Sequence, residues 1–349
     1  MSRILHDGAQ DGLEALCPLD VKKTNTVSEL LAGMSKTAFG GRRLGEALDV
    51  LEAMVRDPDC FVVVTMSGAM TIAKMGLVLC DMIENGAADA IVSTGAIMAH
   101  GLSEATGGVH YKHDPSMDDN ELFAKGYNRV FDTLEMEANL SDTERFVRDA
   151  LNAAGTLPDS SHAMATLLGQ RLHDSGQMPS ILGCAYAAGV PVFVPAFTDS
   201  ELGLDVATYT LARADKNDLD TLLASPPPVF NPFGDLYAYA AKVAPAKRLG
   251  IFTIGGGVPR NWAQQVGPFI DLINGRLGCD FPVPRFHYGV RICPEPVHWG
   301  GLSGCSYSEG ISWGKFVPPD QGGQYAEVHS DATIAWPLLV RGLLERLDV

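Results

Sequence analysis

One lysine lies in an unusual local setting. Lys315 directly follows Trp313 and Gly314, and Glu309 precedes it by six residues. A lysine that packs beside a tryptophan loses part of its hydration, which lowers its pKa and makes it an amine nucleophile toward an imine or carbonyl carbon. The tryptophan can also cover the methylene groups of a cationic ligand. An ordinary solvated surface lysine is the alternative that this local pattern leaves open.

Three consecutive glycines form a second candidate site. Gly255, Gly256 and Gly257 follow an apolar run that predicts a strand. Glycines at such a point let the backbone approach a pyrophosphate or nicotinamide closely, with amide groups free to donate. The run does not have the G-x-G-x-x-G spacing of a dinucleotide fingerprint, so a tight turn is an equal alternative. Residues 67–71 carry a weaker indication of the same kind.

Acidic and histidine side chains give less specific signals. Asp199 and Asp331 each follow a predicted strand, where a carboxylate either binds a ribose hydroxyl or, more simply, caps the next helix. The nine histidines show no HxxxH or HxH spacing, and His110 and His113 lie in a polar loop. We therefore expect no metal site.

The elements that must position these residues alternate along the chain. Short apolar strands are followed by loops of small residues and then by helices, as at residues 61–64, 90–92, 192–194 and 250–254. Strands that are apolar throughout are typical of a parallel sheet buried on both faces. The sequence thus predicts an α/β fold, a doubly wound, mostly parallel, Rossmann-like sheet with helices on both faces. Its ligands should bind beyond the carboxyl ends of the strands.

The chain divides into an arm and one domain. Residues 1–26 have scattered apolar residues and turn-forming pairs, which predict an N-terminal arm. Helical periodicity covers residues 27–55, and residues 27–349 are predicted to form a single domain. Residues 110–120 and 224–234 interrupt the pattern, and we expect both to be surface excursions.

Composition excludes several classes of protein. The 349 residues carry a net charge of −16, which repels phosphate and opposes nucleic-acid and membrane-surface binding. The most apolar stretch, residues 181–197, is interrupted by prolines, and the first 16 residues have no signal-peptide core, so we expect a cytoplasmic protein. Seven cysteines without a CxxC pair favour neither disulfides nor a zinc ribbon.

The lysine motif is similar to that of a known family. Residues 309–315, Glu-Gly-Ile-Ser-Trp-Gly-Lys, resemble the catalytic motif Glu-Ala-Val-Ser-Trp-Gly-Lys of the deoxyhypusine synthase family. Further matching segments follow in family order at about family spacing, namely residues 67–71, 92–96, 195–199, 254–258 and 330–337. The resemblance covers the chain from about residue 61 to the C-terminus.

The resemblance implies a complete chemistry. It implies a Rossmann-like homotetramer that binds NAD, with active sites where paired subunits meet. NAD takes a hydride from the carbon beside the secondary amine of spermidine, and an aminobutyl imine forms on the active lysine. The imine then passes to an acceptor amine, which is a lysine of the translation factor 5A precursor or, in homospermidine synthases, putrescine. We therefore expect an NAD-dependent aminobutyl transferase that acts on a small amine or polyamine.

The resemblance also implies roles for individual residues. Lys315 is the expected nucleophile, and Glu309 and Trp313 are expected to line the substrate. The positions that match the NAD side of the family site are Ser67, Thr71, Thr94, Gly95, Asp199, Gly256, Asp331 and Ala332.

The substrate side departs from the family pattern. An adjacent pair of glutamates is replaced by Ala99 and His100, a histidine by Asn261, and a Gly-Ser-Asp segment by residues 300–302. A further aspartate is displaced by one position to Asp205. His100, Asn261 and Asp205 are thus the expected substrate contacts in this chain.

These departures bear on the donor. Each lost charge-assisted contact weakens polyamine binding by about 1.5–3 kcal/mol, which opposes spermidine as the donor. Arg291 and His298 are candidates for binding a donor that carries a carboxylate or fewer ammonium groups. A homospermidine synthase-type enzyme with a small amine acceptor, and a non-catalytic NAD-binding relative, remain the alternative functions.

Overall fold

A six-stranded parallel sheet forms the centre of the molecule. The computed structural model describes residues 3–176, 179–212, 214, 216, 218–225 and 228–349. The sheet has the strand order β6-β2-β1-β7-β8-β9, and every neighbouring pair is parallel. Its strands are β1 Cys60–Met66, β2 Ala90–Ser93, β6 Val192–Phe193, β7 Arg248–Ile254, β8 Phe286–Ile292 and β9 Gln324–Val328. The strand order reverses between β1 and β7, which confirms the predicted doubly wound fold.

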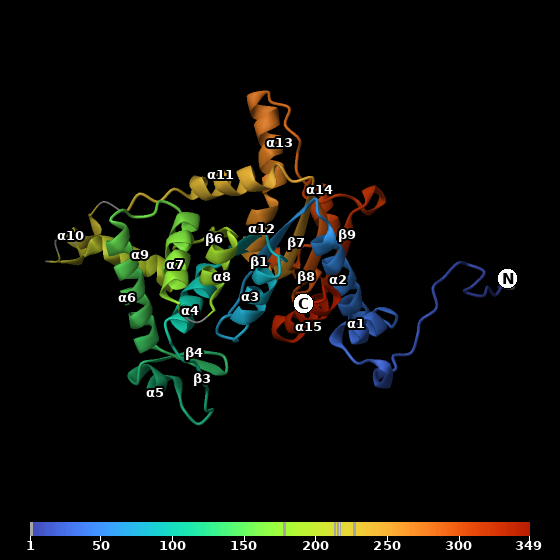
Figure 1. The fold of residues 1–349 in the computed structure, drawn as a ribbon, viewed down its shortest axis with the longest axis horizontal. Coiled ribbons are helices and arrows are strands. Elements are labelled where there is room, and N and C mark those ends of the chain that lie inside the picture. The colour runs from blue at the N-terminus through green and yellow to red at the C-terminus, as the bar shows by residue number, and fades with distance from the viewer. Residues whose placement is uncertain (1–2, 177–178, 213, 215, 217, 226–227) are drawn as a thin grey trace.

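Helices cover both faces of this sheet (Figure 1). Val62 and Val64 of β1 pack into one apolar cluster with helices α1 to α4 and α15, whereas Val63 packs into a second cluster with α11, α12 and α14. This alternation follows from the pleat, which points successive side chains to opposite faces. The helices are α1 Val27–Ser35, α2 Phe39–Arg56, α3 Gly76–Glu84, α4 Gly95–Ala105, α5 Asp119–Ala124, α6 Glu137–Ala154, α7 Ser161–Ser175, α8 Ile181–Ala188, α9 Glu201–Leu211, α10 Leu219–Leu223, α11 Pro232–Val243, α12 Gly257–Gln264, α13 Val266–Leu277, α14 Tyr307–Ser312 and α15 Ala332–Arg346, with short 3-10 turns at Val21–Lys23, Val297–Trp299, Leu302–Gly304 and Pro319–Gln321.

The first α-helix of the chain is α1, which is preceded by a segment with little regular structure. Residues 3–20 contain no helix or strand and extend away from the body (Figure 1). Helix α1 begins at Val27, because the Thr26 side chain accepts a hydrogen bond from the Glu29 amide and caps the helix. The single helical stretch predicted over residues 27–55 is two helices, α1 and α2. They pack so closely that a Cβ on Gly45 would lie 2.4 Å from the Leu31 carbonyl oxygen.

A second, smaller sheet begins within the first predicted excursion and extends beyond it. Strands β3 Tyr111–Lys112, β5 Thr133–Met136 and β4 Tyr127–Val130 pair antiparallel in the order β3-β5-β4. The prediction of a surface loop over residues 110–120 is wrong at its first residue. The His110 side chain is only 1% exposed, because it packs against the buried Glu135 of β5.

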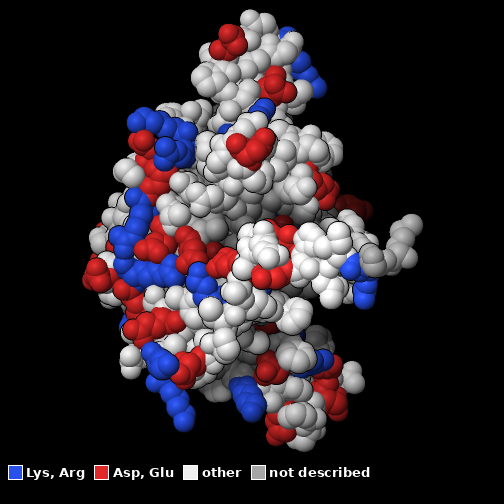
Figure 2. Space-filling view, turned by 90° about the vertical axis from the view of Figure 1, so that its right-hand side faces the viewer, with Lys and Arg blue, Asp and Glu red and all other residues white. Residues whose placement is uncertain are grey.

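The second predicted excursion lies between two helices. Pro226 and Pro227 lie outside the described residues, and the rest of residues 224–234 connects α10 with α11. On the face shown in Figure 2, acidic and basic side chains are interspersed. Among the described residues, no helix combines the length and apolarity that a membrane crossing needs.

Candidate active site

Lys315 is held in a fixed backbone position beside the sheet. It follows α14 through Gly314, whose φ of +70° is a conformation that glycine adopts without strain. The Lys315 amide donates to the Gly310 carbonyl at 3.1 Å, and the Lys315 carbonyl accepts from the Phe286 amide at 3.0 Å. The end of the motif therefore pairs with the first residue of β8, and this pairing fixes the position of the Lys315 backbone.

The Lys315 side chain is largely withdrawn from solvent. The residue is 7% exposed, and its Nζ donates a hydrogen bond to Asn261 Oδ1 at 2.9 Å. The same nitrogen lies 5.9 Å from the centroid of the Trp313 ring. Burial lowers the pKa of Lys315 below its ordinary value, and the positive charge of Arg260 acts in the same direction. A larger fraction of this amine is thus neutral near pH 8 than in a surface lysine.

The amine opens into a cavity of about 730 Å³. Helices α12, α13 and α14 and residues 297–305 form its walls. Its polar and aromatic lining includes Asn261, Asp271, Arg285, Cys305, Glu309 and Trp313. On the rim, Trp313 is 66% exposed and Leu302 is 47% exposed, so the cavity is open on one side. The space is sufficient for a small aliphatic amine with charged ends.

The cavity contains charges of both signs. Asp271 and Glu309 can bind ammonium groups, whereas Arg285 can bind a carboxylate. Arg285 makes no ion pair within 4.0 Å with any of the described residues, so its guanidinium is available to a ligand. Asp271 and Arg285 were not expected here, because both lie in segments that match no motif.

Arg291 and His298 do not line this cavity. Arg291 is 1% exposed, lies 3.1 Å from Glu327, and donates to the carbonyl oxygens of Ser303 and Cys305. Its position on the buried strand β8 explains why it binds the chain itself. The suggestion that Arg291 receives a donor's carboxylate is therefore wrong, and Arg285 is the arginine on the wall.

Four of the predicted NAD-side residues, Ser67, Thr94, Gly95 and Gly256, lie near the point where the strand order reverses. Ser67 follows β1 and Gly256 follows β7, and the Gly256 amide donates to Ser67 Oγ at 2.9 Å. Gly255 and Gly257 have φ values of +83° and +67°, so this turn requires glycine at both positions. Thr94 and Gly95 begin α4 at the end of the neighbouring strand β2. Parallel neighbours lie about 4.8 Å apart, so these segments share one edge.

Two helix N-termini at this edge have no side-chain cap. Neither α4 nor α12 has a side chain that accepts hydrogen bonds from its first amides, and Thr94 Oγ1 is buried without a partner. By contrast, Ser200 caps α9 and Asp331 caps α15. Uncapped amides and the positive end of the helix dipole favour an anion such as a pyrophosphate. The residues at this edge fit NAD in this respect.

The remaining predicted NAD-side residues have varied positions. The Asp331 carboxylate accepts from the Thr333 amide at 2.7 Å, which is the simpler capping role, and Ala332 is the buried first residue of α15. Asp199 is exposed beyond β6. Thr71 is buried, and its hydroxyl donates to the Ile97 carbonyl of α4 at 3.1 Å. Asp331 and Ala332 lie two strands beyond β7, at the opposite end of the sheet from Asp199.

His100 and Asp205 do not belong to the Lys315 cavity. His100 lies on α4 and contacts Glu135. Asp205 lies on α9, where burial and the charges of Glu144 and Glu201 raise its pKa to about 6. Of the predicted substrate contacts, the structure therefore brings together Glu309, Trp313 and Asn261 around Lys315, and places His100 and Asp205 elsewhere in the same chain.

Sequence comparison decides the family. The deoxyhypusine synthase profile matches residues 29–343, which begins earlier than the resemblance seen from motifs alone. The chain belongs to the deoxyhypusine synthase family. It is 34% identical to the "Probable deoxyhypusine synthase 2" of Methanosarcina acetivorans over 330 residues, which cover 94% of this chain and 89% of the relative. Deoxyhypusine synthase family membership indicates a transferase of aminobutyl groups.

Two further relatives agree with this assignment. The "Probable deoxyhypusine synthase 2" of Archaeoglobus fulgidus is 30% identical over 89% of this chain and 96% of its own length. Among solved structures, the crystal structure of a "putative deoxyhypusine synthase" from Entamoeba histolytica aligns with a TM-score of 0.58 at 13% identity, covering 93% of this chain and 94% of that chain. The latter likeness supports the deoxyhypusine synthase fold.

Proposed function

We propose that this protein is an NAD-dependent aminoalkyl transferase that carries the transferred group as an imine on Lys315. The observation that supports this most directly is the buried Lys315 amine, which faces a cavity containing both ammonium-binding and carboxylate-binding groups. A structural or purely NAD-binding relative has no use for a desolvated lysine at such a place.

One short helix connects the lysine with the proposed NAD site. Asn261, which binds the Lys315 amine, lies five residues after Gly256 on α12. Five residues of helix span about 7.5 Å along the axis. Less than two turns of helix thus separate the glycine turn from the residue that binds the reactive amine. This spacing supports a donor that lies between them.

Each residue of the cavity has a defined task in this proposal. NAD, when bound at the switch point, supplies the oxidation of the donor's carbon–nitrogen bond and the later reduction of the product. Neutral Lys315 adds through Nζ to the carbon of the oxidised carbon–nitrogen bond, and the original nitrogen of that bond takes both hydrogens of the lysine amine and leaves as an amine, or as ammonia when the donor is a primary amine. Asn261 Oδ1 orients the attacking amine, and Trp313 covers the alkyl chain. An acceptor amine then displaces Lys315 from the imine.

The charges of the cavity favour a donor with few ammonium groups. Asp271 and Glu309 provide two carboxylates, and Arg285 adds a positive charge that opposes a fully cationic polyamine. We therefore propose a diamine or an amino-acid-like amine as donor in place of spermidine, with a small amine as acceptor in preference to a protein lysine. A protein acceptor would need a cavity that stays open to a macromolecule.

The exposed rim indicates how the site is completed. Trp313 and Leu302 present large apolar surfaces to solvent in the isolated chain. An imine in an open cavity is hydrolysed, so transfer requires that water be excluded. We propose that a second copy of the chain covers this rim within a homotetramer.

Covalent trapping tests this function. The protein is incubated with NAD and, separately, with spermidine, putrescine or ornithine, and is then reduced with borohydride. Mass analysis of the peptide that contains Lys315 should show an added alkylamine whose mass identifies the transferred group. If no amine of a wide panel modifies Lys315 in the presence of NAD, the proposal is wrong.

The pH profile of adduct formation should reflect the lowered pKa of Lys315. Only the neutral amine attacks, so the rate should rise about tenfold per pH unit below the lysine pKa and level off above it. Because burial lowers that pKa, the plateau should begin at a lower pH than for an ordinary lysine. Single-turnover rates from pH 7 to 10 measure this. A Trp313→Ala variant, which hydrates the amine, should move the plateau to higher pH.

Replacing Glu309 with glutamine should weaken donor binding selectively. The carboxylate lines the cavity and provides a charge-assisted contact for an ammonium group. Because Glu309 is exposed, we expect KM for the donor to increase by about tenfold with a smaller change in kcat. Steady-state kinetics test this, with Glu46→Gln on the distant α2 as the control. An unchanged KM would remove Glu309 from the site.

A further inference from the structure

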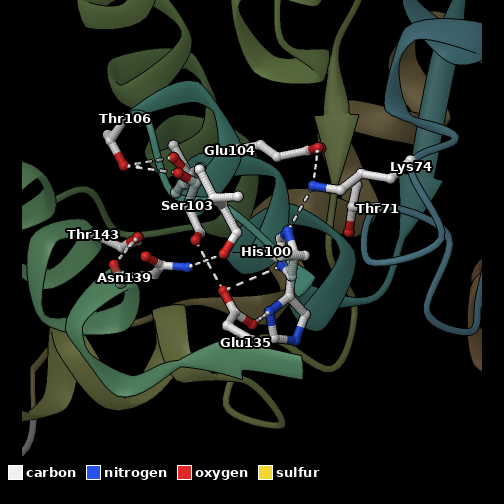
Figure 3. A network of polar contacts seen from close by, with 12 residues as sticks. Thr71, Lys74, His100, Ser103, Glu104, Thr106, Glu135, Asn139 and Thr143 are labelled. Atoms are coloured by element: carbon white, nitrogen blue, oxygen red, sulfur yellow. Dashed lines mark hydrogen bonds and ion pairs between the residues drawn. The ribbon is translucent and has the colours of Figure 1, made fainter. Parts of the chain in front are cut away.

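A second cluster of functional side chains lies outside the Lys315 cavity. His100 on α4 and Glu135 on β5 point toward one another (Figure 3). His110, in the loop that follows α4, is the third member of the cluster. One potential metal-ligand atom of each residue lies within 4.8 Å of the corresponding atoms of the other two residues. Ten residues separate the two histidines and 25 more separate His110 from Glu135, which is why no sequence spacing revealed the group.

The cluster is buried in the interior of the molecule. The side chains of His100, His110 and Glu135 are 13%, 1% and 2% exposed. Buried carboxylates occur in proteins where they are paired with cations or coordinate metals.

The two imidazoles approach Glu135 without completing hydrogen bonds to it. His100 Nδ1 lies 2.5 Å from Oε2, and His110 Nε2 lies 3.4 Å from Oε1. Both nitrogens are nevertheless buried without a hydrogen-bond partner of acceptable geometry. Ser103 Oγ, in contrast, donates a normal bond to Oε1 at 2.8 Å. One potential ligand atom of each residue thus lies close enough to the other two for a single ion to contact all three.

We propose that His100 Nδ1, His110 Nε2 and the Glu135 carboxylate bind a divalent first-row transition metal, for which Zn²⁺ is the best match. Two imidazoles and one carboxylate are a ligand set that zinc uses, with bonds of about 2.0–2.2 Å. Imidazole ligands exclude the oxygen-preferring Ca²⁺ and Mg²⁺. A cation bound by all three residues gives a partner to both histidine nitrogens that lack a hydrogen bond.

The surroundings provide the supporting contacts that such a site requires. Ser103 orients the carboxylate, and Glu201 on α9 adds a second negative charge close enough to act on His100. Lys74 Nζ lies 2.7 Å from His110 Nδ1 and 2.6 Å from Glu104 Oε1. When metal occupies Nε2, Nδ1 carries the hydrogen, so the exposed Lys74 keeps only its contact with Glu104.

The metal would connect two parts of the fold. Glu135 belongs to the small antiparallel sheet, and His100 belongs to α4, whose first residues lie at the proposed NAD edge. The bound ion thereby fastens residues 109–136 to that helix. Metal binding should therefore stabilise the protein irrespective of whether the Lys315 reaction proceeds.

Metal binding by the full-length protein tests the proposal directly. After treatment with chelator and removal of any affinity tag, the protein is titrated with Zn²⁺ and with Co²⁺. We expect one metal per chain by mass spectrometry, a Co²⁺ visible spectrum typical of four or five ligands, and an increase in Tm. Glu135→Gln and His110→Ala should weaken binding by at least tenfold, whereas the surface variant His173→Ala should bind as the unmodified chain does.

Two further variants keep the test decisive. If Glu135→Gln does not fold, the less buried His100→Ala serves in its place. Lys74→Met, which removes a competing donor and a positive charge, should bind Zn²⁺ at least as tightly as the unmodified chain. The proposal is overturned if the unmodified chain binds less than one metal at micromolar concentration, or if all variants bind equally. In that case the cluster is a metal-free contact between α4 and the small sheet.

Discussion

Replacing Lys315 with arginine should abolish alkylamine transfer while leaving the fold intact. Arginine retains the positive charge and much of the side-chain volume, but its guanidinium is not deprotonated in proteins and cannot form the imine. We expect turnover to decrease by about three orders of magnitude or more. The borohydride-trapped adduct on the peptide that contains residue 315 should disappear as well.

A conservative variant nearby separates chemistry from packing. Asn261→Ala removes the partner of the Lys315 amine but leaves the nucleophile. It should reduce the rate and still yield the adduct, because the lysine is less well oriented but remains competent. Circular dichroism should be the same for both variants and the unmodified chain. If Lys315→Arg retained the unmodified rate, the covalent mechanism would be wrong.

Replacing Arg291 with methionine should destabilise the protein strongly. Arg291 is buried on β8, where its guanidinium binds Glu327 and two carbonyl oxygens of the loop that borders the cavity. Methionine fills much of the volume but leaves those acceptors unpaired in the interior. Because Glu327 retains some contact with solvent, we expect a loss of about 3 kcal/mol in the free energy of unfolding.

Urea denaturation measures this loss, and Arg285→Met is the matched control. Arg285 is exposed on the cavity wall and makes no ion pair with the described residues. Its replacement should change stability by less than about 0.5 kcal/mol but should alter donor preference. Equal destabilisation by both substitutions would contradict the distinction drawn between the two arginines.

The parts of the fold that could be predicted are those with local apolar signals. Strands β1, β2 and β7 are continuous apolar runs, because both faces of a parallel sheet are buried. Strand β8 contains the polar residues His287, Tyr288 and Arg291, and the last two bind the distant Asp57 and Glu327. Its sequence therefore lacks the apolar pattern, and it was not predicted.

The same contrast applies to the candidate site. Lys315, Trp313 and Glu309 lie within seven residues, so their common role was visible from the sequence. Asp271 and Arg285 reach the cavity from α13 and the segment before β8, and Glu135 reaches His100 only through the small sheet. Such groupings depend on tertiary packing, which no local spacing encodes.

In the proposed tetramer, the open rim around Trp313 would make the product of the reaction depend on the protein's concentration. When the rim is covered, the imine on Lys315 persists until an acceptor amine binds. When the rim is uncovered, water enters and hydrolyses the imine to a free aldehyde. Subunit dissociation on dilution would therefore convert a group-transfer catalyst into one that degrades its donor. Association between chains would in this way determine which of two chemistries the same lysine performs.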